Sequence, residues 1–239
     1  MERLDKVLAS QNIGSRKEVQ KLIKSGVVTI NGEICKKSEQ KVDPEKDIIT
    51  VSGQPVNYSK YIYIMMNKPQ GVLSASNDKR AETVIDLVPE AMQRKGLFPA
   101  GRLDKDTEGL LIITDDGDFA HRMLSPKKHV EKKYIAKLDG EITEETIKEF
   151  EKGIVFADGT KCMPAKLEIQ DENPRIGIVT ICEGKFHQVK KMFICCGLNV
   201  VHLKRISIGN LILDGKLHSG ECKLLSNLDK ELIFIGNIH

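Results

Sequence analysis

The sequence lacks several features that mark membrane-bound, secreted or carbohydrate-binding proteins. It contains no tryptophan, and aromatic residues make up 5% of its 239 positions, which is poor material for a surface that stacks on sugar rings. No run of about 18 apolar residues is long enough to span a bilayer, and no apolar segment after the first methionine resembles a secretory signal. We therefore expect a cytoplasmic protein with no membrane partner.

Cysteine is present, but without the spacing of a metal site or of a disulfide framework. The 6 cysteines include no Cys-x-x-Cys pair and no ligand-like spacing with histidine. In the cytosol such residues usually stay reduced and behave as small hydrophobic side chains. We therefore expect no metal at Cys35, Cys162, Cys182, Cys195, Cys196 and Cys222.

Charge of the two signs is nearly balanced, and the formal net charge is +3. The excess is localised, because residues 1–60 hold 11 Lys and Arg against 8 Asp and Glu, whereas the remainder holds 26 of each kind. A localised basic surface is typical of nucleic-acid binding. A lysine-rich helix face also occurs simply because charged side chains are well solvated.

Residues 1–60 have the pattern of a small domain with two helices and a few strands. An apolar run at helical spacing opens the segment, and Ser15 with Glu18 forms a capping box that starts a second helix. The dipeptide Asn31-Gly32 lies between two strand-like runs and predicts a tight hairpin. On the second helix, basic residues gather on a side away from the apolar stripe and are candidate phosphate contacts: Arg16, Lys17, Lys21 and Lys24.

Residues 61–239 have a different pattern, in which strands mostly neighbour each other in sequence. Helical patterns are inserted irregularly, near residues 119–124, 144–151 and 187–196. This order predicts an α+β domain on a largely antiparallel, mixed β-sheet with flanking helices. The whole chain is then a small two-helix and hairpin domain followed by a larger domain, with the boundary near residue 60.

The segment FPAGRLDKDTEGLLIITDDG, residues 98–117, presents Asp104 in a turn directly before an apolar strand. Reacting groups are often displayed from such loops on a rigid scaffold. Three other roles are considered for Asp104. A turn cap is one, and a calcium loop is another, although calcium loops need a helix on each side. A glycosidase would use Asp104 with Asp106, placed on either side of one sugar bond.

The segment EGKFHQVKKMFICCG predicts a short helix that places Lys190 off its buried face. A lysine near a carboxylate can pair with it and hold it ionised. Taken alone, Lys190 fits a solvated helix lysine better than a site residue, and His187 by itself is ambiguous.

Together these segments resemble the pseudouridine synthases, in particular the branch that acts on small-subunit ribosomal RNA. GRLDKDTEGLLIITDDG is similar to the catalytic-loop motif of that family, EKKYIAKL to its tyrosine motif, and EGKFHQVKKMF with LKRISIG to its C-terminal motif. Residues 1–60 resemble the S-four-type, or alpha-L, RNA-binding domain of this branch. The resemblance covers essentially the whole chain in the family's order and implies that residues 61–239 form the catalytic domain.

By position, the resemblance implies that Asp104 is the essential aspartate, Tyr134 the active-site tyrosine and Lys190 the basic residue that pairs with the aspartate. Many relatives have arginine at the last position, and lysine makes a less rigid partner. The resemblance also implies substrate contacts, with Leu224 as the apolar residue beside the target base. The candidate substrate contacts are Arg102, His187, Gln188 and Leu224. For Arg102, a structural ion pair is an equal alternative.

The implied reaction breaks the bond from ribose to a base nitrogen, rotates the uracil and rejoins it through a carbon. It involves no net redox change and requires no metal or organic cofactor. We therefore expect an enzyme that acts on one uridine of small-subunit ribosomal RNA or of a ribosomal assembly intermediate, as a monomer. The alternatives are a large-subunit enzyme and a non-catalytic ribosomal RNA-binding assembly protein.

Overall fold

The computed structural model describes residues 1–235. Contacts between Cα atoms divide these residues into two compact units. The N-terminal unit comprises Met1–Ile62 and the short segment Glu90–Gly96, and the C-terminal unit comprises Tyr63–Pro89 and the described chain from Leu97 onward. The boundary near residue 60 stays a prediction, and the sequence pattern did not place the segment 90–96 with the N-terminal unit.

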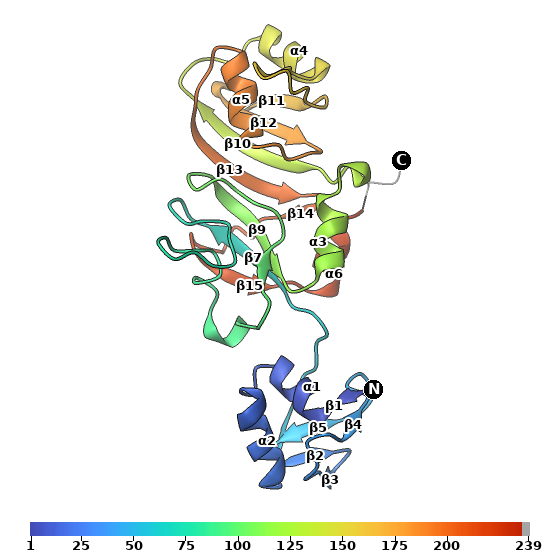
Figure 1. Cartoon of the computed structure of the whole chain (residues 1–239). Helices are drawn as coiled ribbons and strands as arrows, with labels where there is room; N and C mark the ends of the chain where they lie inside the picture. Colours follow the sequence, from blue (N-terminus) through green and yellow to red (C-terminus); the bar gives the residue numbers. More distant parts are fainter. Residues whose placement is uncertain (236–239) are drawn as a thin grey trace. The chain divides into compact units, whose positions relative to one another are not determined.

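Two helices and two small antiparallel sheets build the N-terminal unit (Figure 1). Its four-stranded sheet has the order β3-β2-β5-β6, and β1 pairs with β4. The elements are β1 (Glu2–Arg3), α1 (Leu4–Ser10), α2 (Arg16–Lys24), β2 (Val28–Ile30), β3 (Glu33–Ile34), β4 (Lys41–Val42), β5 (Ile49–Val51) and β6 (Gln54–Pro55). The predicted hairpin joins β2 to β3, and its turn residues Asn31 and Gly32 both have positive φ, 51° and 88°.

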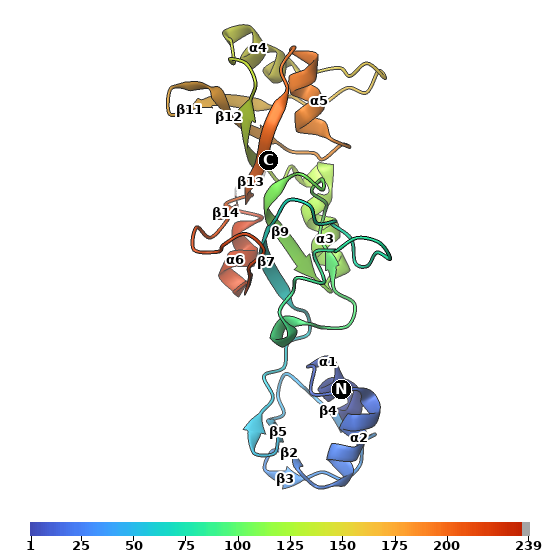
Figure 2. The same cartoon turned by 90° about the vertical axis from the view of Figure 1, so that its left-hand side faces the viewer.

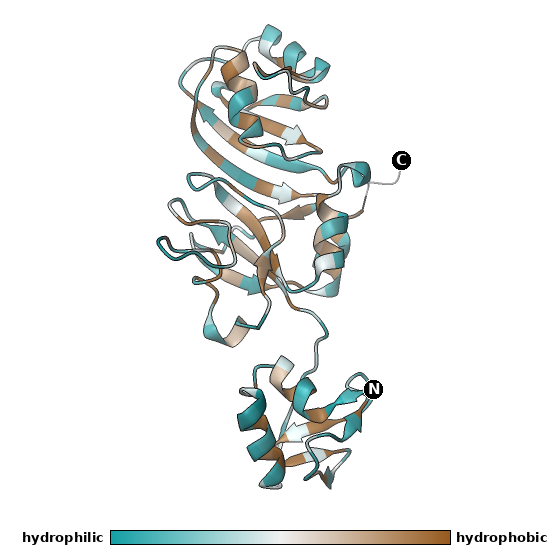
Figure 3. Ribbon diagram, in the orientation of Figure 1, coloured by the Kyte–Doolittle hydropathy of each residue, from teal (hydrophilic) through white to brown (hydrophobic). Residues whose placement is uncertain are grey.

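The start of α2 follows from its capping box. The hydroxyl of Ser15 accepts from the Glu18 amide, while the Glu18 carboxylate accepts from the Ser15 amide, as predicted. Val19 and Ile23 face the core of this unit, whereas the outer turns of α2 are hydrophilic in Figure 3. The helix is therefore anchored on one side and presents charge on the other.

A nine-stranded sheet forms the C-terminal unit, with the order β11-β12-β10-β13-β9-β7-β15 and with β14 and β8 attached to β13 and β9. Among the named strands of residues 63–235, β9 and β13 are the one parallel pair. The strands are β7 (Tyr63–Lys68), β8 (Phe98–Pro99), β9 (Glu108–Thr114), β10 (Lys132–Leu138), β11 (Lys166–Gln170), β12 (Asn173–Ile181), β13 (Val200–Ile208), β14 (Leu211–Ile212) and β15 (Cys222–Leu224).

Helices cover the two ends of this sheet separately. Figures 1 and 2 both place α4 (Glu144–Lys152) and α5 (Gln188–Cys195) beside β11 and β12, where Phe150 and Phe193 pack with ring centroids 4.8 Å apart. At the other end, α3 (Gly117–Leu124) and α6 (Asn227–Leu232) flank β7 and β9, and Phe119 packs edge-on against Tyr63. The predicted α+β fold with a mostly antiparallel, mixed sheet is confirmed. None of the helices within residues 1–235 is both long and apolar enough to cross a membrane.

Candidate active site

Asp104 lies in the loop that joins β8 to β9. Its side chain is 25% exposed, and the amide of Thr107 donates to its carbonyl oxygen at 3.1 Å, which closes a turn. Strands flank this loop on both sides, so the calcium-loop alternative is wrong. Within residues 1–235 no backbone amide donates to the Asp104 carboxylate, so this side chain does not cap a turn.

Lys68, the last residue of β7, holds this loop through its ammonium group. The side chain is fully buried, and burial lowers its pKa to about 8, although the carboxylates of Asp106 and Asp104 act in the opposite direction. Its Nζ donates to the carbonyl oxygens of Pro69, Asp104, Lys105 and Thr107, at 2.9, 3.1, 3.3 and 3.0 Å. The sequence does not single out Lys68; its one local clue is a lysine at the end of an apolar strand.

Lys68→Met should lower the free energy of unfolding by about 2–4 kcal/mol, because buried carbonyl oxygens lose their shared donor. Hydrogen exchange at residues 104–107 should accelerate, since the loop loses the bonds that fix it. The matched control is Lys105→Met, which removes an exposed ammonium from the same loop. Equal stability of the two variants, measured by urea unfolding, would contradict a supporting role for Lys68.

The same variant has a pH signature. The pKa of Lys68 lies below its ordinary value of 10.5, so between about pH 8 and 10.5 the unfolded chain binds more protons than the folded one. The contribution of Lys68 to stability therefore rises with pH across this window. Lys68→Met should remove that part of the rise.

Gly109 brings β9 against β13. The two strands pair at Glu108 with Lys204 and at Gly109 with Arg205. Gly109 has a φ of 101°, and a Cβ atom there would overlap the carbonyl oxygen of Arg205. A glycine is therefore required where the loop of Asp104 enters the sheet.

Helix α5 presents Lys190 to the carboxylate of Asp104. The Lys190 Nζ lies 3.0 Å from one oxygen of Asp104 and 2.5 Å from one oxygen of Asp106, and 18% of the lysine side chain is exposed. Burial lowers the pKa of Lys190, but its hydrogen bonds to Asp106 and Asp104 raise it more, so the ammonium form is favoured. The hydrogen bond from Lys190 also holds the pKa of Asp106 below its ordinary value. The structure thus brings Lys190 and Asp104 together, and their catalytic roles stay predictions.

The residues before and at the start of α5 differ in what they can offer a ligand. His187 places Nε2 3.6 Å from an Asp104 oxygen, and its ring stacks on Phe186 with centroids 3.8 Å apart. Gln188 is buried, and its amide group donates to Glu183 at 2.8 Å and accepts from the Lys185 amide at 2.9 Å. His187 therefore remains available to a substrate, whereas Gln188 fixes the shape of the loop.

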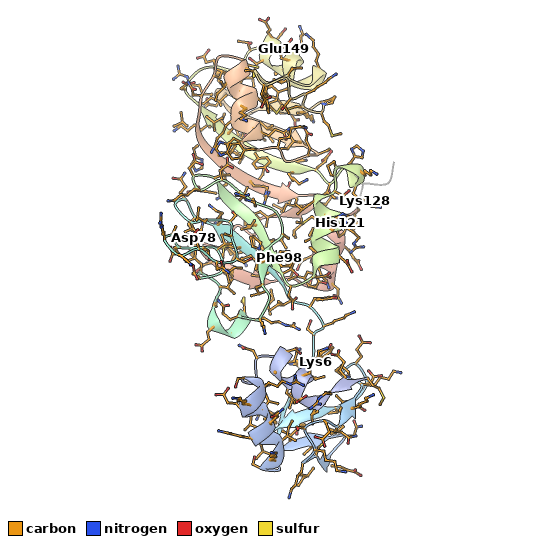
Figure 4. All side chains as sticks on the ribbon, in the orientation of Figure 1. Lys6, Asp78, Phe98, His121, Lys128 and Glu149 are labelled. Atoms are coloured by element: carbon orange, nitrogen blue, oxygen red, sulfur yellow. The ribbon has the colours of Figure 1, made fainter. Side chains whose placement is uncertain are left out.

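A cavity next to Asp104 collects most of the predicted site residues. Asp104, Tyr134, His187, Gln188 and Lys190 border it, as does Arg102. Arg102 is exposed and forms no ion pair within residues 1–235, so the structural ion pair considered for it is absent there. The cavity widens towards the segment between β7 and β8, which contributes Asp78, labelled in Figure 4.

Tyr134 and a group of apolar side chains form the walls of this cavity. Tyr134 lies on β10 and is 7% exposed. Leu224 does not border the cavity; it lies on β15 beside Ile64 of β7, with 53% exposure. The alignment of Leu224 with the base-contacting position is corrected here. The apolar residues that border the narrower part of the cavity are Leu103, Ile181, Val189 and Leu203, and Leu203 belongs to the same LKRISIG segment that the sequence singled out.

Two basic residues of the cavity wall were not expected from the sequence. Lys132 and Arg205 both border its wider part, and both are buried. Burial and then the charge of Arg205 lower the pKa of Lys132 to about 8. Both lie in segments that the sequence singled out, EKKYIAKL and LKRISIG. Neither was given a role there, because each segment is rich in lysine or arginine and in apolar residues.

The basic residues of α2 divide into two kinds. Lys17, Lys21 and Lys24 are exposed and form no ion pair within the described chain. Arg16 instead lies 3.2 Å from Asp5, a carboxylate that is fully buried. Burial raises the pKa of Asp5, but hydrogen bonds from Arg3, Gln20 and Arg16 outweigh it and leave that pKa far below its usual range. Arg16 is therefore part of the framework of this unit as well as of its basic face.

The geometry suits a reaction on a planar ring that is assisted by a carboxylate. A carboxylate held beside an ammonium group can act as a nucleophile or stabilise positive charge. The phenol of Tyr134 offers both a ring face and a hydroxyl for proton transfer. Apolar walls complete a pocket that would bind a flat, weakly polar ring.

Comparisons with known proteins agree with this picture. A family model described as RNA pseudouridylate synthase matches residues 62–194, and a model of the S4 domain matches residues 2–49. An uncharacterized RNA pseudouridine synthase of Bacillus subtilis is 49% identical over 233 residues, which are 97% of this chain and 98% of that protein.

Two further relatives carry names that differ in the ribosomal subunit. The ribosomal small subunit pseudouridine synthase A of Escherichia coli is 39% identical over 94% of this chain and 96% of its own length. The ribosomal large subunit pseudouridine synthase B of Bacillus subtilis is 38% identical over 95% of this chain and 93% of its own length. A crystal structure of a pseudouridylate synthase superposes with a TM-score of 0.67 and 37% identity, covering 98% of this chain and all of that one.

Proposed function

Because the chain belongs to the RNA pseudouridylate synthase family, we propose that it converts one uridine of small-subunit ribosomal RNA into pseudouridine. The observation that carries the proposal is the ion pair of Asp104 and Lys190, at 3.0 Å, in a cavity bordered by Tyr134. The segment GKFHQVKKMF, with lysine at position 190, favours the small subunit over the large one.

In the proposed reaction Asp104 is the group that acts on the nucleotide. The bond between the ribose carbon and the base nitrogen breaks, and its electron pair leaves with the uracil. Asp104 either bonds to the sugar carbon or stabilises its positive charge, or else bonds to the base. The freed uracil rotates, and its ring carbon bonds to the ribose. Any bond that Asp104 has made breaks, and its electron pair returns to the carboxylate. The ring carbon then loses its proton, and the nitrogen gains one. The numbers of atoms and electrons are unchanged, so no oxidant is consumed.

The other residues position the substrate. Lys190 pairs with Asp104 and orients it, and Tyr134 contacts the uracil ring and assists proton transfer. A stacked uridine hides the bond that must break, so the nucleotide has to flip into the cavity. Arg102, exposed at the cavity edge, contacts the strand during this step. Leu103 and Leu203 pack against the inserted base.

The test is to incubate the purified protein with transcripts of small-subunit and large-subunit ribosomal RNA and to map pseudouridine in both. One new pseudouridine in the small-subunit transcript is expected, and the same position should be unmodified in cells without the gene. Modification of only the large-subunit transcript would overturn the choice of subunit. If neither transcript and no assembly intermediate is modified, the proposed activity is wrong.

The S4 domain supplies a second, separable part of RNA binding. Replacing Lys17, Lys21 and Lys24 by glutamine should weaken RNA affinity and reduce the slope of affinity against salt, because each phosphate contact releases about one counterion. Arg16 is tested separately, since its loss also removes one of the two ion-pair partners of the buried Asp5.

The matched control for the triple variant carries glutamine at Lys36, Lys37 and Lys41, which are exposed in the same unit but lie outside α2. Both variants lose three positive charges and so have the same net charge. A difference in RNA binding between them therefore reports the position of the lost charges. Equal salt slopes in the two variants would show that RNA approaches by another surface.

We further propose that the protein works as a monomer in the cytoplasm, where ribosomal subunits are assembled. Its partner is then ribosomal RNA, free or within an assembly intermediate. Comparing modification of bare transcripts with modification of partly assembled subunits separates these two substrates.

A further inference from the structure

Two buried cations border the cavity on the side of Tyr134. Lys132 begins β10 and Arg205 lies on β13, and they are 5% and 3% exposed. Arg205 is paired with Tyr134 in the strand register, and its Cζ lies 6.0 Å from the centre of the Tyr134 ring. Both border the wider part of the cavity, which Asp104 shares.

The hydrogen bonds of these cations leave part of their donor capacity unused. The Lys132 Nζ donates to the carbonyl oxygen of Val130 at 2.9 Å. In Arg205, Nε donates to the carbonyl oxygen of Leu110 at 2.7 Å and Nη1 donates to the Tyr134 hydroxyl at 3.4 Å, while Nη2 is buried without an acceptor. Within residues 1–235 neither cation forms an ion pair.

Such a pair is unfavourable unless an anion joins it. Buried charges without a counterion cost several kcal/mol each, and two like charges side by side add repulsion, which is one reason why the pKa of Lys132 falls to about 8. The backbone bonds to Leu110 and Val130 hold both side chains in place. The site is thus preorganised for negative charge on a ligand that enters the cavity.

We propose that Arg205 and Lys132 form an oxyanion subsite that binds uracil in its detached, anionic form. The proposal rests on the proposed function and specifies the part of the site that handles the base. When the glycosidic bond breaks with its electron pair on nitrogen, the negative charge spreads onto the ring oxygens. The Nη2 of Arg205, which has no acceptor, and the ammonium of Lys132 donate hydrogen bonds to one of these oxygens.

The depth of the two cations favours a base over a backbone phosphate as the source of the oxyanion. A flipped base is joined to the strand through one bond and can enter a cavity, whereas a phosphate is joined to the chain on both sides and stays near its edge. Arg102 is exposed at that edge. Arg205, at 3% exposure, borders the wider part of the cavity, which the uracil ring of the flipped nucleotide enters.

The positions also separate two charges of the reaction. Lys190 borders the narrower part of the cavity with Asp104, and Arg205 and Lys132 border only the wider part. Asp104 and Tyr134 border both parts. The ammonium of Lys190 therefore pairs with the carboxylate that acts on the nucleotide, and the second pair of cations stabilises the leaving base. Stabilising charge that develops only as the bond breaks raises the rate of the chemical step more than the affinity.

The first experiment measures binding of small uracils without any reaction. 5-Nitrouracil is largely an anion at neutral pH, whereas 5-methyluracil is neutral and of similar shape. The wild-type protein should bind the anion at least about tenfold more tightly, and Arg205→Gln and Lys132→Gln should each lose most of this preference. The matched control is Lys133→Gln, the next residue of β10, whose exposed side chain points to the other face of the strand.

The second experiment is single-turnover modification of the ribosomal RNA transcript that wild-type protein modifies. Arg205→Gln should lower the rate constant about a hundredfold, with RNA affinity and its salt slope unchanged and with Arg205→Lys intermediate. Lys132→Gln provides an independent variant if Arg205→Gln does not fold.

Three results would overturn the inference. The first is equal or undetectable binding of the two uracils by wild-type protein. The second is a normal single-turnover rate in both variants. The third is a decrease in RNA affinity and in its salt slope in the variants, which would indicate that the two cations bind a phosphate. If wild-type protein modifies no RNA, the proposed function fails, and the uracil comparison still decides whether the cavity prefers an anion.

Discussion

Asp104→Asn should abolish pseudouridine formation while the protein still folds and binds RNA. Asparagine keeps the size of the side chain but removes its negative charge and nucleophilicity, so the chemical step should slow by about 10⁴-fold or more. Affinity arises mainly from phosphate contacts spread over basic surfaces, so it should stay within about twofold. The measurement is single-turnover modification of transcript by folded variant, with binding measured on the same RNA.

Asp106→Asn is the matched control for this variant. Asp106 lies in the same loop and also contacts Lys190, but 71% of its side chain is exposed. Its replacement should cost about tenfold or less, because Lys190 keeps its contact with Asp104. Near-normal turnover by Asp104→Asn would remove this residue from catalysis, and with it the proposed mechanism.

Lys190→Ala should lower turnover about a thousandfold, because the carboxylate at the reacting centre loses its ammonium partner. Single-turnover rates of the folded variant, with RNA binding measured alongside, check this expectation.

Two variants separate a specific role of Lys190 from a general effect on α5. Lys190→Arg keeps a positive charge within reach of Asp104 and should retain most of the turnover. Lys191→Ala removes the next ammonium of the helix, which lies over the rings of Phe156 and Phe186, and should leave most of the turnover. Unchanged turnover in Lys190→Ala would show that its contact with Asp104 has no catalytic consequence.

Local patterns predict the parts of this fold that depend on a few neighbouring residues. The capping box of Ser15 and Glu18 and the turn at Asn31 and Gly32 are decided within four residues. The loop of Asp104 is predictable for the same reason, because glycine and an apolar strand follow it directly in the chain.

Long-range contacts account for what the sequence did not reveal. Lys68 is recognisable as a support only once residues 104–107 fold back over it. Arg205 becomes unusual only through its burial beside Tyr134. Leu203 and Leu224 are both leucines of strands near the C-terminus, and only the pairing of β13 with β10 places the first of them in the cavity.

The parallel pairing of β9 with β13 also affects the mechanics of the site. It spans two residue pairs, whereas β7 with β9 spans six and β10 with β13 spans seven. We therefore expect bending of the sheet to be easiest at this short seam, which the 2.7 Å contact of Glu108 with His202 braces. Asp104 belongs to one half and Lys190 to the other, so the distance between them depends on the geometry of the seam. Substitutions at Glu108 or His202 are expected to change that distance, although neither residue borders the narrower part of the cavity.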